Sequence, residues 1–304
     1  MYDIIGDIHG HASVLKELLE EMDYRKTGGS YRHPERKVLF LGDYIDRGPE
    51  VRETLKLVRE MVDAGQATAL MGNHEFNAIL FNEPDGDGGF LRPHSDKNRK
   101  QHRETLKDFE GRMEEYRSYI EWFKTLPLFY EGDSFRAIHA CWDASMVDEL
   151  RDFSTGSLLE PEYFPMAGDS STRLYEVVET LLKGREVPLP NGLSFKDRGG
   201  HQRRDVRVRW WLDPREVTLE QWSFAEGIEG SSADSFDPLE YYQSHYGEDE
   251  KPVFFGHYWL TGEPELERSN ICCLDYSVGE KDKLAAYRHH GEDELKPEQL
   301  HWVE

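Results

Sequence analysis

The sequence predicts an α/β fold with a largely parallel sheet, because strand-like and helix-like patterns alternate over its first third. The short run "YDII" is mainly apolar, and "KVLFLGD" contains a continuous apolar run from Val38 to Leu41, as buried strands do. Between them, "ASVLKELLEEM" has apolar residues at helical spacing. The next helix-like run has Pro49 near its start and Gly65 past its end. A third strand-like run, "ATALMG", completes a βαβαβ order, which is typical of parallel strands covered by helices.

Length and composition indicate one large globular unit. The chain has 304 residues, 38% of them hydrophobic, which suffices for one core or for one domain with an insertion. Its net charge of −23 argues against a nucleic-acid polymer as a partner. No apolar stretch approaches the about 20 residues that span a bilayer, so no membrane partner is expected. Three cysteines and the lack of a visible signal peptide favour a cytoplasmic location.

Polar motifs follow each of the three predicted strands. The first strand is followed by "GDIHG", the second by "GDYIDRG" and the third by "GNHE". Each motif combines a glycine, which allows a sharp turn, with carboxylate, imidazole or amide groups that bind metal ions. In such sheets ligands bind beyond the carboxyl ends of the strands. One D-x-H pair would be weak evidence, but three motifs at equivalent strand ends predict a metal site.

These motifs, in this order and spacing, resemble the calcineurin-like metallophosphoesterases, and within them the phosphoprotein phosphatase branch that includes bacterial diadenosine tetraphosphatases. Two later runs, "FRAIHACWD" and "KPVFFGHYWL", resemble the further single-histidine motifs of the family. The resemblance implies a four-layer αββα sandwich of two mixed sheets, formed by a single domain over residues 1–304. The segment from about 144 to 251 is longer than this core needs, and we interpret it as a cap-like insertion over the metal site.

The resemblance also implies two divalent metal ions bridged by a carboxylate. Manganese fits the mixed oxygen and nitrogen ligands best, with iron or zinc as alternatives. A water or hydroxide between the ions would attack phosphorus in line, without a covalent phosphoenzyme. The implied ligands are Asp7, His9 and the bridging Asp43 for one ion, and Asp43, Asn73, His139 and His257 for the other.

Further residues are implied to act on the substrate. His74 matches the general acid that protonates the leaving group, and Asp46 matches the carboxylate that orients this histidine. Arg47 matches the arginine that binds phosphate oxygens, and Asn73 is implied to contact phosphate as well. A second arginine is usual in the family, and five candidates remain open: Arg198, Arg203, Arg204, Arg207 and Arg209.

The expected function is that of a metal-dependent phosphatase acting on phosphomonoesters. Protein phosphatase activity on phosphoserine or phosphothreonine is the leading hypothesis, and symmetrical cleavage of dinucleoside tetraphosphates is the alternative. The expected partner is therefore a phosphorylated protein or a nucleotide. A binding module that keeps its metals for structure is an alternative of another class. The Asp46–His74 pair and Arg47 argue against it, because a purely structural site needs neither an acid nor a phosphate clamp.

Other residues receive structural interpretations. Glu75 is expected to act at a helix start. Cys141 is expected to be a small buried residue, because no arginine follows it as in cysteine-dependent phosphatases. Residues 83–104 are polar and predict a long surface loop before a helix near residues 112–124. Eight histidines lie in polar stretches and are expected to be solvated: His33, His94, His102, His201, His245, His289, His290 and His301.

Overall fold

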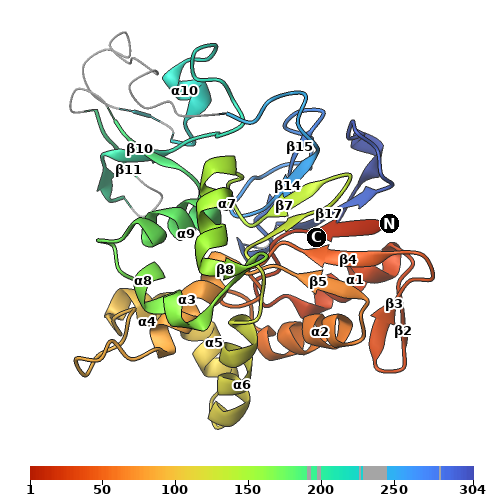
Figure 1. Cartoon of the computed structure of the whole chain (residues 1–304). Coiled ribbons are helices and arrows are strands. Elements are labelled where there is room, and N and C mark those ends of the chain that lie inside the picture. Colours follow the sequence, from red (N-terminus) through yellow and green to blue (C-terminus); the bar gives the residue numbers. More distant parts are fainter. Residues whose placement is uncertain (190–192, 197–199, 226, 229–244, 281) are drawn as a thin grey trace.

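Two mixed β-sheets form the centre of the molecule, as the sequence resemblance implied (Figure 1). The computed structural model describes all residues except 190–192, 197–199, 226, 229–244 and 281. The larger sheet runs in the order β16 (Asp275–Tyr276), β17 (Lys283–His289), β1 (Tyr2–Ile5), β4 (Lys37–Phe40) and β5 (Ala67–Ala69), and β18 (Leu300–Val303) pairs with β17. The smaller sheet runs in the order β15 (Ile271–Cys273), β14 (Val253–Phe255), β7 (Arg136–Ile138) and β6 (Phe129–Glu131).

The first third of the chain has the predicted βαβαβ order. Strands β1, β4 and β5 are parallel, with Ile5 opposite Phe40 and Phe40 opposite Ala69. The helices α1 (Ala12–Glu21) and α2 (Val51–Asp63) connect them, within two residues of the predicted boundaries. Since parallel strands end at the same edge of a sheet, the polar motifs that follow these strands meet there.

Successive residues of the central strands pack into two different cores. Ile4 and Leu39 join Phe254 of the smaller sheet in the core between the sheets. Ile5 and Phe40 point to the opposite face and join the core beneath the helices. Side chains alternate along a strand, so a strand covered on both faces is apolar on both of them. This explains the consecutive apolar residues at 4–5 and 38–40, while the buried Asp3 of β1 pairs with Arg36.

Helices cover the outer sides of the sheets (Figure 1). Helix α3 begins within the third polar motif, at Asn73, and α6 confirms the helix predicted near residues 112–124. The predicted loop at 83–104 contains helix α4, whose residues are all at least partly exposed, so its sequence has no apolar period that would reveal it. These helices are α3 (Asn73–Asn82), α4 (Asp96–Gln101), α5 (Arg103–Asp108), α6 (Met113–Phe123), α7 (Ala144–Leu150) and α9 (Arg173–Lys183).

The segment from 144 to 251 contains two structural parts. Helices α7 and α9 pack on each other and join the main core through side chains such as Leu150 and Leu181. A small second core, which includes Val187, Val206 and Trp222, lies between the remaining elements. Those elements are the antiparallel pair β10 (Glu186–Pro188) and β13 (Asp205–Arg207), the pair β11 (Phe195–Lys196) and β12 (Gln202–Arg203), and helix α10 (Leu219–Trp222).

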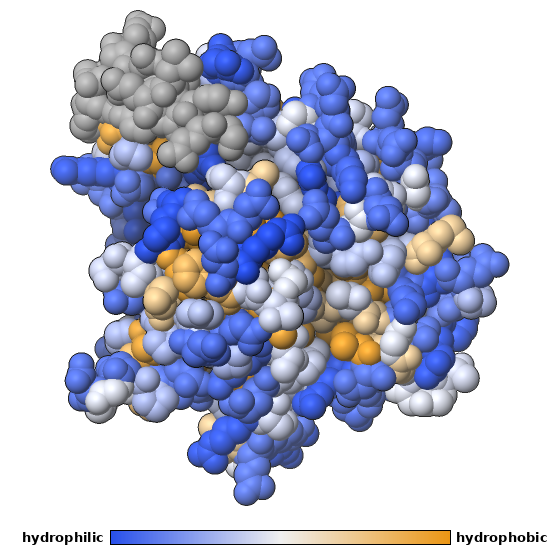
Figure 2. Space-filling model, in the orientation of Figure 1, coloured by the Kyte–Doolittle hydropathy of each residue, from blue (hydrophilic) through white to orange (hydrophobic). Residues whose placement is uncertain are grey.

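The outside of the molecule is mainly polar and carries several short elements (Figure 2). The face shown in Figure 2 is mainly hydrophilic, in keeping with the strongly acidic composition. Within the described residues, no helix has both the length and the apolar character that a membrane span requires. The remaining elements are β2 (Arg25–Thr27), β3 (Ser30–Arg32), β8 (Ser154–Thr155), β9 (Leu158–Leu159), α8 (Phe164–Ala167) and the 3₁₀ helices at Arg151–Phe153, Pro161–Tyr163, Val278–Glu280 and Pro297–Gln299.

Candidate metal centre

The six expected metal ligands lie together, just beyond strands β1, β4, β7 and β14 and at the first residue of α3. Four of them, together with His74, supply atoms to two groups that share Asp43, and within each group the atoms lie within 4.8 Å of one another. One group contains His9 and His74, and the other contains His139 and His257. Every one of the six residues is buried, with at most 9% of its surface exposed. Residues up to 250 positions apart in the sequence therefore meet in one site.

Asp43 occupies the middle of this cluster. Its Oδ2 atom lies 3.5 Å from Nε2 of His9, and its Oδ1 atom lies 3.4 Å from Nε2 of His139. The backbone N–H of His74 also donates to Oδ1, at 3.0 Å. Burial opposes ionisation of this carboxyl, but His139 and His74 outweigh it and hold the pKa of Asp43 well below its usual range. An anionic carboxylate thus faces imidazole groups on two sides, as a bridging ligand would.

Asn73 links the two histidines of the second group. Its Oδ1 atom lies 3.0 Å from Nε2 of His139 and 2.8 Å from Nδ1 of His257. An amide oxygen and two imidazole nitrogens are therefore directed at the same small region, next to the shared carboxylate.

Two polar atoms in this cluster show that the residues fit metal ions. Oδ1 of Asp7 and Nε2 of His9 are buried, and neither has a hydrogen-bond partner among the described residues. Burying a polar atom without a partner costs about 1–3 kcal/mol. A metal ion would satisfy both atoms, and carboxylate, imidazole and amide donors suit divalent first-row metals.

The loops that carry the site have an unusual backbone conformation. Two glycines allow the second and third motifs to touch: a Cβ atom on Gly42, where φ is +110°, would lie 2.6 Å from Cα of Gly72. Strained backbone of this kind persists where the surrounding structure enforces it, and it concentrates at functional sites. Five site residues that are not glycine have a positive φ angle: His9, Asp43, Asp46, Arg47 and His257.

Glu75 supports the loop that follows β4, which agrees with its expected structural role. One carboxylate oxygen accepts from the backbone N–H groups of Asp43 and Gly72, at 2.9 and 3.0 Å. The other accepts from Tyr44 and Ile45, at 2.9 and 3.3 Å. Burial, together with the charge of Asp43, raises the pKa of Glu75 to about 7. This side chain therefore fixes the loop that positions the shared ligand.

His74 and Asp46 form the expected pair. Nδ1 of His74 lies 2.5 Å from Oδ2 of Asp46, and Nε2 of His74 lies 3.9 Å from the carboxylate of Asp43. Burial lowers the pKa of a histidine, but here the carboxylates of Asp43 and Asp46 outweigh it and raise the pKa of His74. The pair can hold a proton that is directed towards the metal centre.

Two further residues that hold Asp46 were not found from the sequence. His102 and Thr105 both bind its Oδ1 atom. The expectation that His102 is solvated is wrong, since it is only 5% exposed, and the same holds for His289, at 2%. His102 lies in a polar run, "SDKNRKQHRE", and nothing in that run shows that the chain folds back onto Asp46.

Two arginines reach the cluster from different parts of the chain. The guanidinium of Arg47 lies 3.3 Å from the ring centre of Trp259, and Nη1 of Arg207 lies 3.1 Å from Nε2 of His257. The Nε atoms of both arginines are buried without a partner among the described residues. Arg209 instead binds backbone carbonyl groups in its own segment, and Arg198 lies outside the described residues. Among the second-arginine candidates, Arg207 is therefore the one whose guanidinium is seen beside an expected metal ligand.

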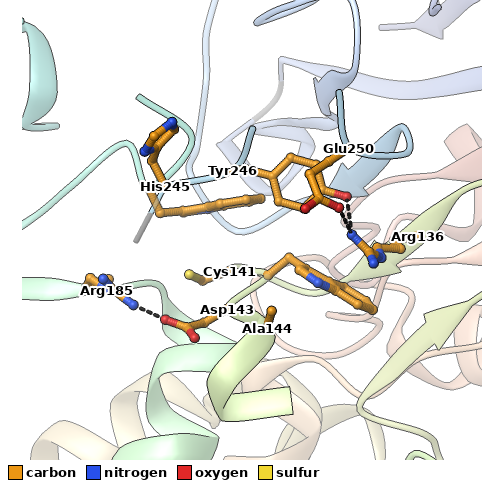
Figure 3. Close-up of a pocket in the computed structure, with 10 residues that line it drawn as sticks. Arg136, Cys141, Asp143, Ala144, Arg185, His245, Tyr246 and Glu250 are labelled. Carbon is orange, nitrogen blue, oxygen red and sulfur yellow. Dashed lines mark hydrogen bonds and ion pairs between the residues drawn. The ribbon is translucent and has the colours of Figure 1, made fainter. Parts of the chain in front are cut away.

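A cavity of about 90 Å³ lies beside the loop that follows β7, and its lining contains none of the metal-site residues (Figure 3). Its charged groups pair with one another: Arg136 binds Glu250 at 2.6 Å, and Arg185 binds Asp143. Cys141 also lines it, and burial raises the pKa of this thiol to about 12. The thiol is therefore unsuited to act as a nucleophile near neutral pH, in agreement with the structural interpretation of Cys141.

A sheet edge with two buried His/Asp groups around a shared carboxylate, beside a His–Asp pair and arginines, defines a metal-dependent phosphoesterase. The model of the calcineurin-like phosphoesterase family matches residues 2–258, so the chain belongs to this family. The predicted fold, enzyme class and family are thereby confirmed.

Individual relatives add detail. The chain is 24% identical over 298 residues to a symmetrical bis(5'-nucleosyl)-tetraphosphatase of Marinomonas sp., covering 94% of this chain and 92% of that protein. It is 45% identical over 74 residues to the asymmetrical bis(5'-nucleosyl)-tetraphosphatase PrpE of Halalkalibacterium halodurans, but this match spans only 24% of the chain and 30% of the relative. A serine/threonine phosphatase structure from Saccharomyces cerevisiae aligns with a TM-score of 0.51 at 13% identity, covering 99% of this chain and 78% of that one.

Proposed function

We propose that this protein hydrolyses dinucleoside tetraphosphates symmetrically, with two nucleoside diphosphates as the products. The observation that carries this proposal is the similarity to the symmetrical tetraphosphatase of Marinomonas sp., which extends over nearly the whole of both chains. The similarity to the asymmetrical enzyme has higher identity, but it covers only about a quarter of this chain. The full-length match favours cleavage at the centre of the tetraphosphate.

The ranking of the two substrate hypotheses is therefore reversed. On the sequence alone, protein phosphatase activity led narrowly over symmetrical cleavage of dinucleoside tetraphosphates. The serine/threonine phosphatase that aligns with this chain shares 13% identity, which supports a common fold and says nothing about the substrate.

The proposed metal ligands are Asp7, His9, Asp43, Asn73, His139 and His257. When bound, two divalent ions would polarise phosphoryl oxygens and lower the pKa of a water molecule, which supplies the nucleophile at neutral pH. Manganese is the expected metal, and iron and zinc are the alternatives. All three accept this donor set.

The side chains around the metal ligands bind and orient the phosphates in this proposal. Arg47 and Arg207 bind phosphate oxygens from two sides, and the amide of Asn73 contacts a third position. These arginines are also needed electrostatically, since a chain of net charge −23 repels an anionic substrate at long range. Stacking on Trp259 keeps the planar guanidinium of Arg47 in place.

His74 supplies the proton for the leaving group. Water adds its oxygen to one phosphorus and releases one proton, the bond from that phosphorus to the bridging oxygen breaks, and His74 protonates the departing diphosphate oxygen. The proton released by the water restores the acid form of His74. Asp46 holds Nδ1 of His74, which leaves Nε2 as the atom that delivers the proton.

The test is product analysis with diadenosine tetraphosphate and manganese. We expect ADP as the only nucleotide product, with no turnover by the Asp43→Asn variant. ATP and AMP in equal amounts would instead show asymmetrical cleavage. A phosphoserine peptide assayed in parallel reports on the protein phosphatase alternative. If two ions are bound and neither substrate reacts, a binding role replaces the proposal.

A further inference from the structure

Asp46 is held by more groups than its pairing with His74 requires. Its Oδ1 atom lies 2.8 Å from Nδ1 of His102 and 2.5 Å from Oγ1 of Thr105. The hydroxyl of Thr105 also accepts from the backbone N–H of Asp46, at 3.0 Å, so its hydrogen must be donated to the carboxylate. Both residues come from the segment around α5 (Arg103–Asp108), which lies outside the strand-end motifs.

A chain of hydrogen bonds determines which nitrogen of His102 carries its proton. The amide nitrogen of Asn82 donates to the carbonyl of Ala78 at 2.8 Å, and a carbonyl can only accept. The same nitrogen donates to the hydroxyl of Tyr116 at 2.7 Å, and this hydroxyl lies 2.8 Å from Nε2 of His102. The hydroxyl hydrogen is then free to be donated to Nε2. The proton of His102 therefore lies on Nδ1, where the carboxylate of Asp46 accepts it.

The environment makes these bonds effective. His102, Thr105, Tyr116 and Asp46 are each at most 5% exposed, so water does not compete for the bonds. Asp46 also has a φ angle of +70°, which is uncommon for residues other than glycine although an aspartate tolerates it. Its carboxylate is contacted on both oxygens, by His74 on one and by His102 and Thr105 on the other.

We propose that His102 is a positioning residue, which donates its Nδ1–H to Asp46 and thereby fixes the carboxylate that orients His74. This inference rests on the proposed role of His74 as the general acid. It adds a residue of the polar segment at 83–104, which the sequence predicted to be a surface loop, to the groups that orient the general acid. Tyr116 and Asn82 act one and two steps further away, by selecting the proton position on His102.

The proposal predicts that the loss of kcat in a His102 variant depends on the basicity of the leaving group. A misplaced acid slows the departure of a strongly basic leaving group and matters little for a weakly basic one. Phenyl phosphate has the more basic leaving group and 4-nitrophenyl phosphate the less basic one, whereas the phosphate group is the same in both. A merely structural role for His102 would slow both substrates equally.

The experiment compares His102→Leu with His102→Asn. Leucine fills the space without a donor. This matters because a cavity of about 10 Å³ beside His102 can admit a water molecule that would replace the lost donor in a smaller variant. Asparagine can place an N–H near the position of Nδ1. His94→Leu is the matched control, since His94 stacks between Phe81 and Phe90 in the same segment, and its ring bonds in the described structure go to Phe81 and Arg99.

We expect His102→Leu to reduce kcat about tenfold more for phenyl phosphate than for 4-nitrophenyl phosphate, with KM little changed. His102→Asn should recover most of that difference, and His94→Leu should show none. The proposal would be overturned if His102→Leu lost kcat equally on both substrates. It would also be overturned if His94→Leu showed the same difference between the two substrates as His102→Leu.

A second readout does not depend on turnover. Nitrogen NMR of histidine-labelled protein, with the His102 signals assigned by comparison with the His102→Asn variant, should show a proton on Nδ1 of His102. An unprotonated Nδ1 would overturn the proposal. Failure to cleave dinucleotides would overturn the proposed function alone, because the aryl phosphates and the NMR signal still report on His102.

Discussion

The strand-end motifs and the two long segments between them contribute to the site in different ways. Residues after β1, β4 and β5 supply Asp7, Asp43 and Asn73 within the first 75 positions, directly beyond neighbouring strands. The segments at 83–104 and 144–251 supply His102 and Arg207 from elements at the edge of the fold.

This difference follows from what constrains each region. The strand-end residues are placed by the parallel sheet itself, so their spacing in the sequence reports their position. Residues such as His102 are placed by how a polar segment folds back onto the core, and many spacings would achieve this. Substitutions in the two regions should therefore differ in the size of their effect on catalysis.

The largest effect is expected at the centre of the strand-end group. Asp43→Asn should lower kcat/KM by about a thousandfold or more, because it removes the negative charge between two metal positions. Asparagine tolerates the positive φ angle of this residue, so the fold should be retained. Metal analysis of the purified variant should show fewer bound ions than in the wild type. Full metal content with full activity would contradict the bridging role.

The next effect tests the contribution of the long segment. Arg207→Ala should lower kcat/KM about 100-fold, the typical loss when one donor to a phosphoryl group is removed. Arg209→Ala is the matched control, since Arg209 binds the backbone carbonyls of Gln221 and Ser223. Steady-state kinetics with diadenosine tetraphosphate measures both variants. Equal losses would mean that this segment contributes stability and not phosphate binding.

A smaller effect concerns the pH profile. The carboxylates of Asp43 and Asp46 raise the pKa of His74 against the opposing effect of burial. Asp46→Asn removes one of these charges, so the pKa of His74 falls and the ring loses its proton at a lower pH. The alkaline limb of the kcat profile should therefore move to lower pH, with a rate about tenfold lower on that limb.

The profile should be measured with phenyl phosphate, whose basic leaving group depends on the acid. The Arg209→Ala variant provides a comparison, because the guanidinium of Arg209 binds the backbone carbonyl groups of Gln221 and Ser223. An unchanged alkaline limb in Asp46→Asn would exclude His74 as the titrating acid.

The smallest effect is expected at Cys141. Cys141→Ala should leave kcat/KM within about twofold of the wild type, since a buried thiol with a raised pKa is not a nucleophile. Treatment of the native enzyme with iodoacetamide should likewise leave activity intact. A large loss in either experiment would require a role for the cavity beside the loop after β7.

Much of the fold was predictable because burial on both faces leaves a clear pattern. The apolar runs of β1 and β4, and the helical spacing in α1 and α2, appear at the predicted positions. Helix α4 was missed because its exposed residues carry no apolar period. His102 and His289 were misjudged because polar neighbours in sequence do not predict polar neighbours in space.

The sequence by itself determined the family, the two-sheet fold and the residues that converge as candidate metal ligands, since each of these depends on local motifs placed at the ends of strands. It left five arginines as equal candidates, and it gave no role to His102. Only the tertiary structure brought Arg207 to His257 and His102 to Asp46. The physical reason is that these contacts join elements that are far apart in the sequence. They depend on side-chain geometry, which the apolar periodicity of the sequence does not predict.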